Sequence, residues 1–176
     1  MTRSVLVVTH HGRAEAVRAS ALAVRALREA GIRPVREDEH HELDGCEMVL
    51  VLGGDGTILR AAELTRGTDV PVLGINLGHV GFLAESEREQ VEEVVRRVAE
   101  RDYEVEERGT VDVRIIRPGM EPESDWALNE ATVEKSTRSR MVEVVLEVDG
   151  RPLSSFGCDG VVMATSTGST AHAFSA

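Results

Sequence analysis

The residues Gly53-Gly54-Asp55-Gly56-Thr57 have the types and spacing of a phosphate-binding turn. They follow an apolar run typical of a buried strand, and the helical spacing of apolar residues resumes after them. Glycines at the carboxyl end of a parallel strand let the backbone adopt a positive φ and approach a ligand closely. The first N–H groups of the next helix point toward an anion there. We therefore expect phosphate binding at this turn.

Two better-known phosphate motifs do not fit the turn. A Walker A loop needs glycine followed by Lys and then Ser or Thr, and Lys135 is the only lysine in the chain. The dinucleotide fingerprint needs a third glycine where this chain has Leu59. The lysine-based mechanism is thereby excluded.

Asp55 is the residue of the turn that could carry chemistry. A carboxylate in a phosphate site is repelled by its ligand unless it holds a cation or accepts a proton from a nucleophile. The alternative is that Asp55 caps the helix or shapes the turn. Arg60, one helical turn further on, could contact a phosphate or could be a solvated surface charge.

Alternating strands and helices must position this turn. The apolar patterns predict a parallel, buried sheet with right-handed crossovers, which makes residues 1–107 an α/β nucleotide-binding domain. Gly31 is expected to end the first helix. The predicted elements are strands at Ser4–Thr9, Ile32–Val35, Met48–Leu52 and Val70–Ile75, helices at Ala14–Ala30, Ile58–Leu64 and Glu87–Glu100, and a solvated loop at Glu37–Glu47.

The pattern changes near Tyr103 to β runs without intervening helices. Residues 108–176 therefore read as the N-terminal part of a β-rich, β-sandwich-like domain. Its predicted strands are Val111–Ile116, Trp126–Val133 and Met141–Val148, with a turn at Asp149-Gly150-Arg151-Pro152. The small residues from Gly157 to Ala176 indicate a backbone-lined binding surface followed by the first turns of a helix.

Composition excludes several classes of function. With 176 residues and a formal net charge of -11, the field of the protein repels nucleic acid and anionic membranes, so a phosphate ligand must be attracted locally. Cys46 and Cys158 fit no zinc pattern or disulfide framework, which suits a reducing cytoplasm. The run Val5-Leu6-Val7-Val8 is too short for a membrane span, and no cleavage site follows it.

Three further motifs follow the glycine turn along the chain. They are Leu73-Gly74-Ile75-Asn76-Leu77-Gly78 with Gly81-Phe82-Leu83, then Asn129-Glu130, then Asp159-Gly160 with Thr165 to Ser175. In this order and spacing the four motifs resemble those of the NAD kinase family, of the bacterial type. The first motif alone is shared with lipid kinases and phosphofructokinases.

The resemblance implies transfer of a phosphoryl group from ATP, or in some bacterial members from polyphosphate, to the 2′-hydroxyl of the adenosine ribose of NAD, giving NADP. It implies that Asp55 accepts the proton and that Gly53, Gly54, Gly56 and Thr57 hold the donor phosphates. Mg²⁺ or another divalent cation would bridge those phosphates, a sufficient set for phosphoryl transfer.

The resemblance also carries contacts with NAD onto this chain. Without it, Asn129 and Glu130 could equally be turn residues at a strand end, Asp159 could start a turn, and Phe82 could be a core residue. The implied contacts are Gly56, Arg60, Phe82, Asn129, Glu130, Arg140, Asp159, Thr170, Ala171 and Ser175, with His172 at the adenine side of the pocket.

Two positions depart from the family pattern, which usually reads Thr-Pro-Thr-Gly-Ser-Thr-Ala-Tyr at residues 165–172. Ser166 replaces the proline, which loosens the loop but removes no ligand group. His172 replaces the tyrosine, and we expect this to alter the affinity for NAD rather than abolish function. The histidines His10, His11, His40, His41 and His79 are expected to be loop residues, and no metal ligand is assigned among them.

The chain ends where the β-rich domain of the family continues. We therefore expect a partial second domain with exposed apolar faces, a chain that is poorly soluble or inactive as it stands, and a homo-oligomer for the full-length protein. Two other functions fit parts of the sequence. One is a related lipid or sugar kinase, which should lack the Asn129-Glu130 and Thr165-to-Ser175 motifs, and the other is a non-catalytic NAD-binding fragment.

Overall fold

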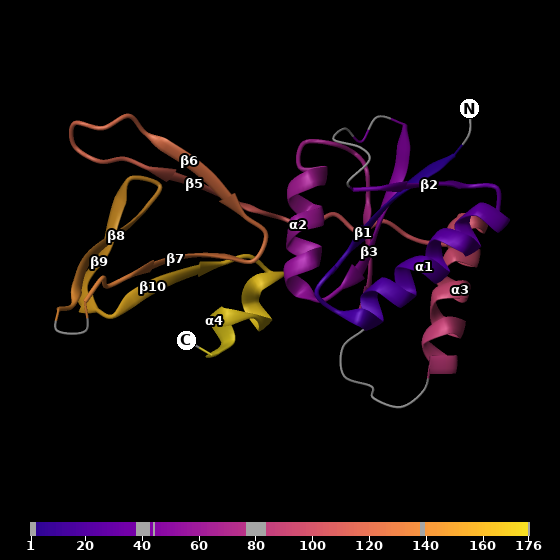
Figure 1. Cartoon of the computed structure of the whole chain (residues 1–176). Coiled ribbons are helices and arrows are strands. Elements are labelled where there is room, and N and C mark those ends of the chain that lie inside the picture. The colour runs from indigo at the N-terminus through magenta and orange to yellow at the C-terminus, as the bar shows by residue number, and fades with distance from the viewer. Residues whose placement is uncertain (1–2, 38–42, 44, 77–83, 138–139, 176) are drawn as a thin grey trace. The chain divides into compact units, whose positions relative to one another are not determined.

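The chain folds into two compact units, Met1–Glu106 (unit 1) and Glu107–Ala176 (unit 2). The computed structural model describes residues 3–37, 43, 45–76, 84–137 and 140–175 (Figure 1). The elements of unit 1 are β1 (Ser4–Thr9), α1 (Ala14–Glu29), β2 (Arg33–Arg36), β3 (Cys46–Gly53), α2 (Asp55–Thr65), β4 (Val72–Asn76) and α3 (Ala84–Glu100). Those of unit 2 are β5 (Val111–Ile115), β6 (Glu123–Ala127), β7 (Glu130–Glu134), β8 (Val142–Val148), β9 (Arg151–Cys158), β10 (Gly160–Ala164), the 3-10 turn η1 (Gly168–Thr170) and α4 (His172–Ser175).

Unit 1 is built on a parallel sheet in the order β2-β1-β3-β4. Every residue of the inner strands β1 and β3 except Glu47 is buried, and most are apolar, as expected for strands that are covered on both faces. In Figure 1, α1 and α3 lie on one side of this sheet and α2 lies on the other. The predicted α/β architecture is therefore observed.

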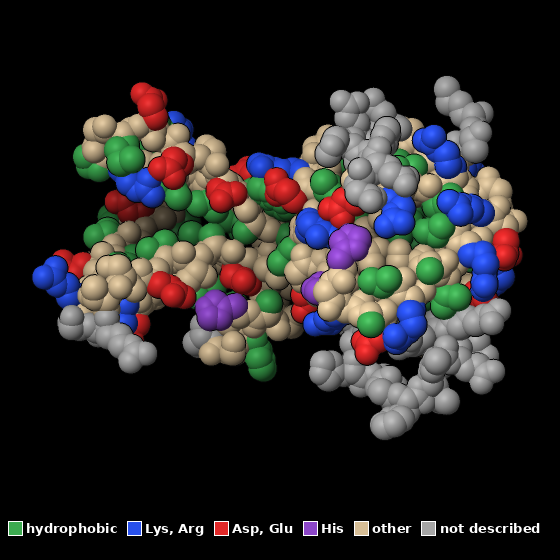
Figure 2. Space-filling view, in the orientation of Figure 1, with side chains coloured by type: hydrophobic (Ala, Val, Ile, Leu, Met, Phe, Trp, Pro, Cys, Tyr) green, Lys and Arg blue, Asp and Glu red, His purple; other side chains and the backbone are tan. Residues whose placement is uncertain are grey.

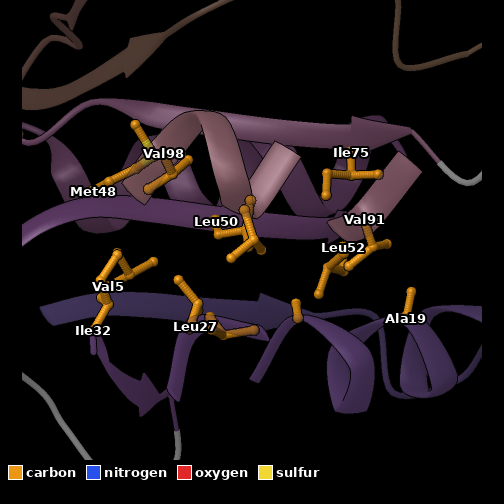
Figure 3. Packing of buried hydrophobic residues seen from close by; sticks show 13 residues of the cluster. Val5, Ala19, Leu27, Ile32, Met48, Leu50, Leu52, Ile75, Val91 and Val98 are labelled. Atoms are coloured by element: carbon orange, nitrogen blue, oxygen red, sulfur yellow. The ribbon is translucent and has the colours of Figure 1, made fainter. Parts of the chain in front are cut away.

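Alternate residues of each inner strand enter two separate cores. On one face Leu50 and its neighbours pack against Leu27 of α1 and Val91 of α3, as Figure 3 shows. On the other face Val49 and Val51 pack with Ala61 of α2. The period of two along the strand thus accounts for both helical layers. The valines of α3 share one face, with Val91, Val95 and Val98 buried and Val94 partly buried.

Arg3 ties the start of the sheet to the end of α3. Its guanidinium donates to both carboxylate oxygens of Glu47, at 2.8 and 3.0 Å from Nε, and to the carbonyl oxygens of Val98 and Ala99 at 2.8 and 2.7 Å. The hydrogen bonds to Glu47 hold the pKa of Arg3 above its ordinary value. Arg3 and Glu47 lie at the amino ends of β1 and β3, which run parallel. This contact therefore fixes the end of the sheet opposite the glycine turn.

Unit 2 consists of three antiparallel strand pairs, β5 with β6, β8 with β9 and β7 with β10. Asp149 and Gly150 both have positive φ, at 51° and 70°, which is the geometry of a tight hairpin turn between β8 and β9. β7 and β10 are distant in sequence, so their pairing links the middle of unit 2 to its C-terminal part. A β-rich second part was predicted, and it is present.

Apolar side chains of unit 2 face solvent. Every buried hydrophobic side chain among the described residues belongs to unit 1. On the face shown in Figure 2, hydrophobic side chains line a hollow of unit 2 between the β5–β6 and β7–β10 pairs. The large hydrophobic residues exposed in this unit include Ile116, Met120, Met141, Val145, Leu153, Phe156 and Phe174.

Several predicted boundaries were wrong. The strand expected at Met48–Leu52 begins at Cys46, inside the expected loop, and most of that loop lies outside the described residues. The helix expected from Ile58 begins at Asp55, so most of the supposed glycine loop is helix. The single strand expected at Trp126–Val133 is two strands that are broken at Leu128-Asn129. Arg151 and Pro152, which we assigned to a turn, begin β9.

Candidate functional site

The glycine turn is a direct junction between a strand and a helix. β3 ends at Gly53, Gly54 is the N-cap, and Asp55 is the first residue of α2. The carbonyl oxygen of Gly54 accepts from the N–H groups of Thr57 at 2.9 Å and Ile58 at 3.2 Å, which starts the helix. The N–H groups of Asp55 and Gly56 precede the first N–H that bonds within the helix, that of Thr57, so they are oriented toward an anion at the helix terminus.

The turn needs Gly53 because of crowding. A Cβ atom at Gly53 would lie 2.9 Å from Cβ of Thr57 and 3.1 Å from Cβ of His10. The expected positive φ is not observed at any of the three glycines of the turn, and Gly54 is extended with a φ of -101°. That part of the sequence interpretation was wrong, whereas the close approach of the backbone to its neighbours is present.

Asp55 is exposed at the start of α2. Gly54 is the N-cap and no side chain caps this helix, so the alternative that Asp55 is a capping residue does not match the geometry. The carboxylate of Asp55 has no hydrogen-bond or ion-pair partner in the described part of the chain. It is accessible to a ligand at the amino end of the helix.

Arg60 is held within unit 1. Its Nη2 donates to the carbonyl oxygen of Thr9 at 3.1 Å and to the carboxylate of Glu37 at 2.9 Å. It is therefore an ion-paired residue that joins α2 to the carboxyl ends of β1 and β2. The Arg60 side chain is 45% exposed, so the surface-charge alternative fits in part, and the predicted phosphate contact stays a prediction.

In unit 2 the structure brings two of the sequence motifs together. The carbonyl oxygen of Asn129 accepts from the N–H of Thr165 at 2.8 Å, and the hydroxyl of Thr165 donates to the carbonyl oxygen of Leu128 at 2.6 Å. A Cβ atom at Gly168 would lie 2.0 Å from that Asn129 oxygen, so only glycine fits the contact. The turn before β7 is thus formed by a segment distant in sequence.

Two polar atoms near this junction are buried and have no hydrogen-bond partner in the part of the chain that the structure describes. They are Oε2 of Glu130, the first residue of β7, and Oγ1 of Thr167, which precedes Gly168. Buried polar atoms are ordinarily hydrogen-bonded, so unpaired ones mark a place where a polar ligand could bind. A carboxylate and a hydroxyl are suited to the hydroxyl and amine groups of a nucleoside.

Asp159 stands between β9 and β10 and forms an ion pair with Lys135. The Nζ of Lys135 lies 2.5 Å from Oδ1 of Asp159, and the Lys135 N–H donates to the Asp159 carbonyl oxygen at 3.0 Å. Nε2 of His172 lies 3.9 Å from a carboxylate oxygen of Glu134. These residues surround a hollow of about 420 Å³ lined by Thr132, Glu134, Lys135, Asp159, Gly160, Val162 and His172.

The remaining predicted contacts are solvent-exposed or outside the description. Arg140 is exposed, and no partner of its side chain lies among the described residues. Thr170, Ala171 and Ser175 are exposed on η1 and α4. Phe82 lies outside the described residues, as do His40, His41 and His79.

Sequence reasoning missed two residues of these sites. Lys135 was noted only as the single lysine of the chain, and its proximity to Asp159 follows from the pairing of β7 with β10. Arg13, at the N-cap of α1, lies beside Gly54, where its Nη1 is 3.6 Å from the position of a Cβ. No local signal marks Arg13, because its proximity to Gly54 follows from the pairing of β1 with β3.

The described residues contain neither a metal-binding cluster nor a membrane-spanning helix. No three histidine, cysteine, aspartate or glutamate side chains gather there as a metal site. No helix among them is long and apolar enough to cross a membrane.

Comparison with known proteins places both units in one family of sequences. The profile of the ATP-NAD kinase N-terminal domain matches residues 5–103, and that of the ATP-NAD kinase C-terminal domain matches residues 128–176. NAD kinase 2 of Streptomyces coelicolor is 52% identical over 192 residues, which cover 99% of this chain and 64% of that protein. The NAD kinase of Leifsonia xyli is 53% identical over 194 residues, again 99% and 64% of the two chains.

Solved structures show the same fold. The crystal structure of an NAD kinase from Archaeoglobus fulgidus in complex with ATP is 29% identical, with a TM-score of 0.66 over 100% of this chain and 65% of that one. The yeast NADH kinase complexed with NADH has a TM-score of 0.81 at 20% identity and covers 98% of this chain and 60% of its own. The chain spans 64% of the length of the curated relatives it matches first.

Proposed function

Because this chain belongs to the NAD kinase family, we propose that it transfers the terminal phosphoryl group of ATP to the 2′-hydroxyl of the adenosine ribose of NAD, giving NADP. The observation that carries the proposal is the exposed carboxylate of Asp55 at the amino end of α2, which has no partner among the residues that the structure describes. The α2 terminus supplies donors for phosphate, and Asp55 supplies the base that a ribose hydroxyl needs.

The proposed reaction is a single displacement at phosphorus. Asp55 accepts the proton of the 2′-hydroxyl while the ribose oxygen bonds to the terminal phosphorus of the donor. The bond from that phosphorus to the bridging oxygen breaks, and ADP leaves with the electron pair. The N–H groups of Asp55 and Gly56 hold the transferred group in line, because phosphoryl transfer depends mainly on alignment and charge neutralisation.

A divalent cation fits this site as a partner of the phosphates. Mg²⁺ is usually held by one or two carboxylates together with substrate phosphates, and Asp55 is an unpartnered carboxylate in the described chain. Mg²⁺ or another divalent ion would neutralise charge on the donor phosphates there. The N–H groups of Asp55 and Gly56 would orient the donor phosphates around the cation.

The proposed contacts with NAD lie on the motifs already described. The unpartnered Oε2 of Glu130 supports a hydrogen bond from a hydroxyl or amine of NAD, and the Asn129 amide is suited to the same nucleoside. Asp159 would accept from the nicotinamide amide, at the hollow that it lines with His172. Gly56, Arg60, Phe82, Arg140, Thr170, Ala171 and Ser175 complete the proposed set.

Two observations bear on the alternatives. A lipid or sugar kinase is expected to lack the Asn129-Glu130 and Thr165-to-Ser175 motifs, and both are present in this chain. The prediction that the chain is poorly soluble or inactive stands beside the proposal, and it rests on the exposed apolar side chains of unit 2. A chain that binds NAD without turnover would be the non-catalytic alternative.

One coupled assay separates these possibilities. NADP formation is measured with NAD as acceptor and with ATP or inorganic polyphosphate as donor, while NAD binding is measured by calorimetry on the same sample. NADP that appears only with a donor present supports the proposal and identifies that donor. Binding of NAD without formation of NADP supports the non-catalytic alternative. A chain that neither binds NAD nor forms NADP would contradict the assignment.

A further inference from the structure

The carboxyl ends of β1 and β3 form the point where the sheet topology reverses. The strand order is β2-β1-β3-β4, so the chain leaves β1 toward one edge of the sheet and leaves β3 toward the other. α1 and α2, which follow these strands, pack on opposite faces. In open parallel sheets ligands bind in the crevice outside the strand ends at such a reversal. The connections that flank it here are Gly12-Arg13 and Gly53-Gly54.

Arg13 is the cation at this crevice. It occupies the N-cap of α1, where its N–H donates to the carbonyl oxygen of His10 at 3.2 Å. Its Nη1 lies 3.6 Å from the position that a Cβ of Gly54 would take, so the guanidinium covers the N-cap of α2. Arg13 is exposed, and its side chain has no hydrogen-bond or ion-pair partner within the described chain.

The place of Arg13 is unfavourable unless an anion binds beside it. A positive charge at a helix amino end is repelled by the helix dipole, and Arg13 stands at the amino end of α1 and beside that of α2. A phosphate in the crevice would interact favourably with both helix ends and with the guanidinium. Arg60, the other arginine discussed at this edge, is paired with Glu37.

We propose that Arg13 binds the phosphate chain of the donor at the crevice between β1 and β3. The proposal rests on the proposed function, and it supplies the local positive charge that a chain of net charge -11 needs to attract a polyphosphate. The planar guanidinium can bind two phosphate oxygens at once, which a lysine in that position could not do. The glycine turn contains no cationic residue, and Arg13 supplies that charge as a substrate-binding residue.

The test compares Arg13→Gln with Arg18→Gln in the 176-residue chain. Arg18 is also exposed on α1, has no partner in the described residues, and loses the same charge when substituted. Inorganic tripolyphosphate is titrated by calorimetry, and KM values for ATP and for NAD are measured by NADP formation. We expect Arg13→Gln to weaken tripolyphosphate binding and to raise the KM for ATP by about tenfold or more, the size of a lost charge-assisted contact.

The control and the second substrate decide the outcome. We expect tripolyphosphate binding and both KM values of Arg18→Gln to stay within about twofold of the unsubstituted protein, because distant surface charges are screened. We expect the KM of Arg13→Gln for NAD to stay within the same range. Equal losses in the two variants, or no loss in Arg13→Gln, would overturn the inference while NADP formation still supported the function. Tripolyphosphate binding that depends on Arg13 in a chain that forms no NADP would support the inference and overturn the function.

Discussion

β3 of unit 1 and β9 of unit 2 are both eight residues long, but their environments are opposite. All residues of β3 are buried apart from Glu47, whereas all residues of β9 are exposed apart from Cys158. β3 lies between two parallel neighbours with helices on both faces, while β9 is hydrogen-bonded to β8 alone. The glycine turn therefore follows a buried strand, whereas the residues proposed to contact the nucleoside in unit 2 are held by backbone contacts.

The largest effect that sharpens this comparison is expected in the core of unit 1. Leu50 is 1% exposed, so Leu50→Ala should lower the free energy of unfolding of unit 1 by about 2–5 kcal/mol through lost burial and a cavity. Val145 on β8 is 64% exposed, and Val145→Ala should change stability by less than about 0.5 kcal/mol. Hydrogen exchange of the β3 and β8 amides measures both, and equal effects would contradict the contrast between the units.

A second effect is expected at the contact between Gly168 and Asn129, because no buried hydrophobic side chain among the described residues belongs to unit 2. Gly168→Ala puts a methyl group 2.0 Å from the Asn129 oxygen, so the backbone must move, at a cost of about 1–3 kcal/mol. The Thr165 amide should then exchange faster and NAD binding should weaken. Gly109→Ala is the matched control, because no atom lies within 4 Å of its added Cβ. Unchanged exchange at Thr165 in Gly168→Ala would show that the junction does not hold the unit.

The smallest effect is expected at the ion pair between Lys135 and Asp159, which both line the hollow of about 420 Å³ in unit 2. Asp159 has a side chain that is 75% exposed, so solvent screens its attraction to Lys135. Lys135→Met should weaken NAD binding by no more than about fivefold, the value of a pair worth about 1 kcal/mol, and Lys135→Arg should restore most of it. A loss of a hundredfold or more would mean that Lys135 contacts the ligand directly.

The sequence predicted unit 1 better than unit 2 for a physical reason. β1 has the predicted bounds, and α1 ends within one residue of its prediction, because apolar periodicity and Gly31, with its φ of 74°, are local signals. The start of α2 was missed because glycine and aspartate are typical of loops. The helix starts there because the Gly54 carbonyl oxygen accepts from the N–H groups of Thr57 and Ile58.

In unit 2 the missed features depend on distant partners. The break at Leu128-Asn129 is made by Thr165, whose hydroxyl donates to Leu128 across 37 residues, and the only local sign of it is the turn-forming Asn129. β9 contains Pro152 and two serines, and it is a strand because β8 pairs with it. Of the candidate site, Asp55 and the glycine turn were evident from sequence, whereas Arg13 and Lys135 become visible only once strand order is known.

The rate of NADP formation by Asp55→Asn tests the central claim most directly. Asparagine keeps the size of the side chain and removes the base, so kcat should fall by about a hundredfold to ten-thousandfold. NAD binding measured by calorimetry should stay within about threefold, because other residues are proposed to carry it. A variant that turns over within about threefold of the unsubstituted protein would contradict the assignment of Asp55 as the proton acceptor.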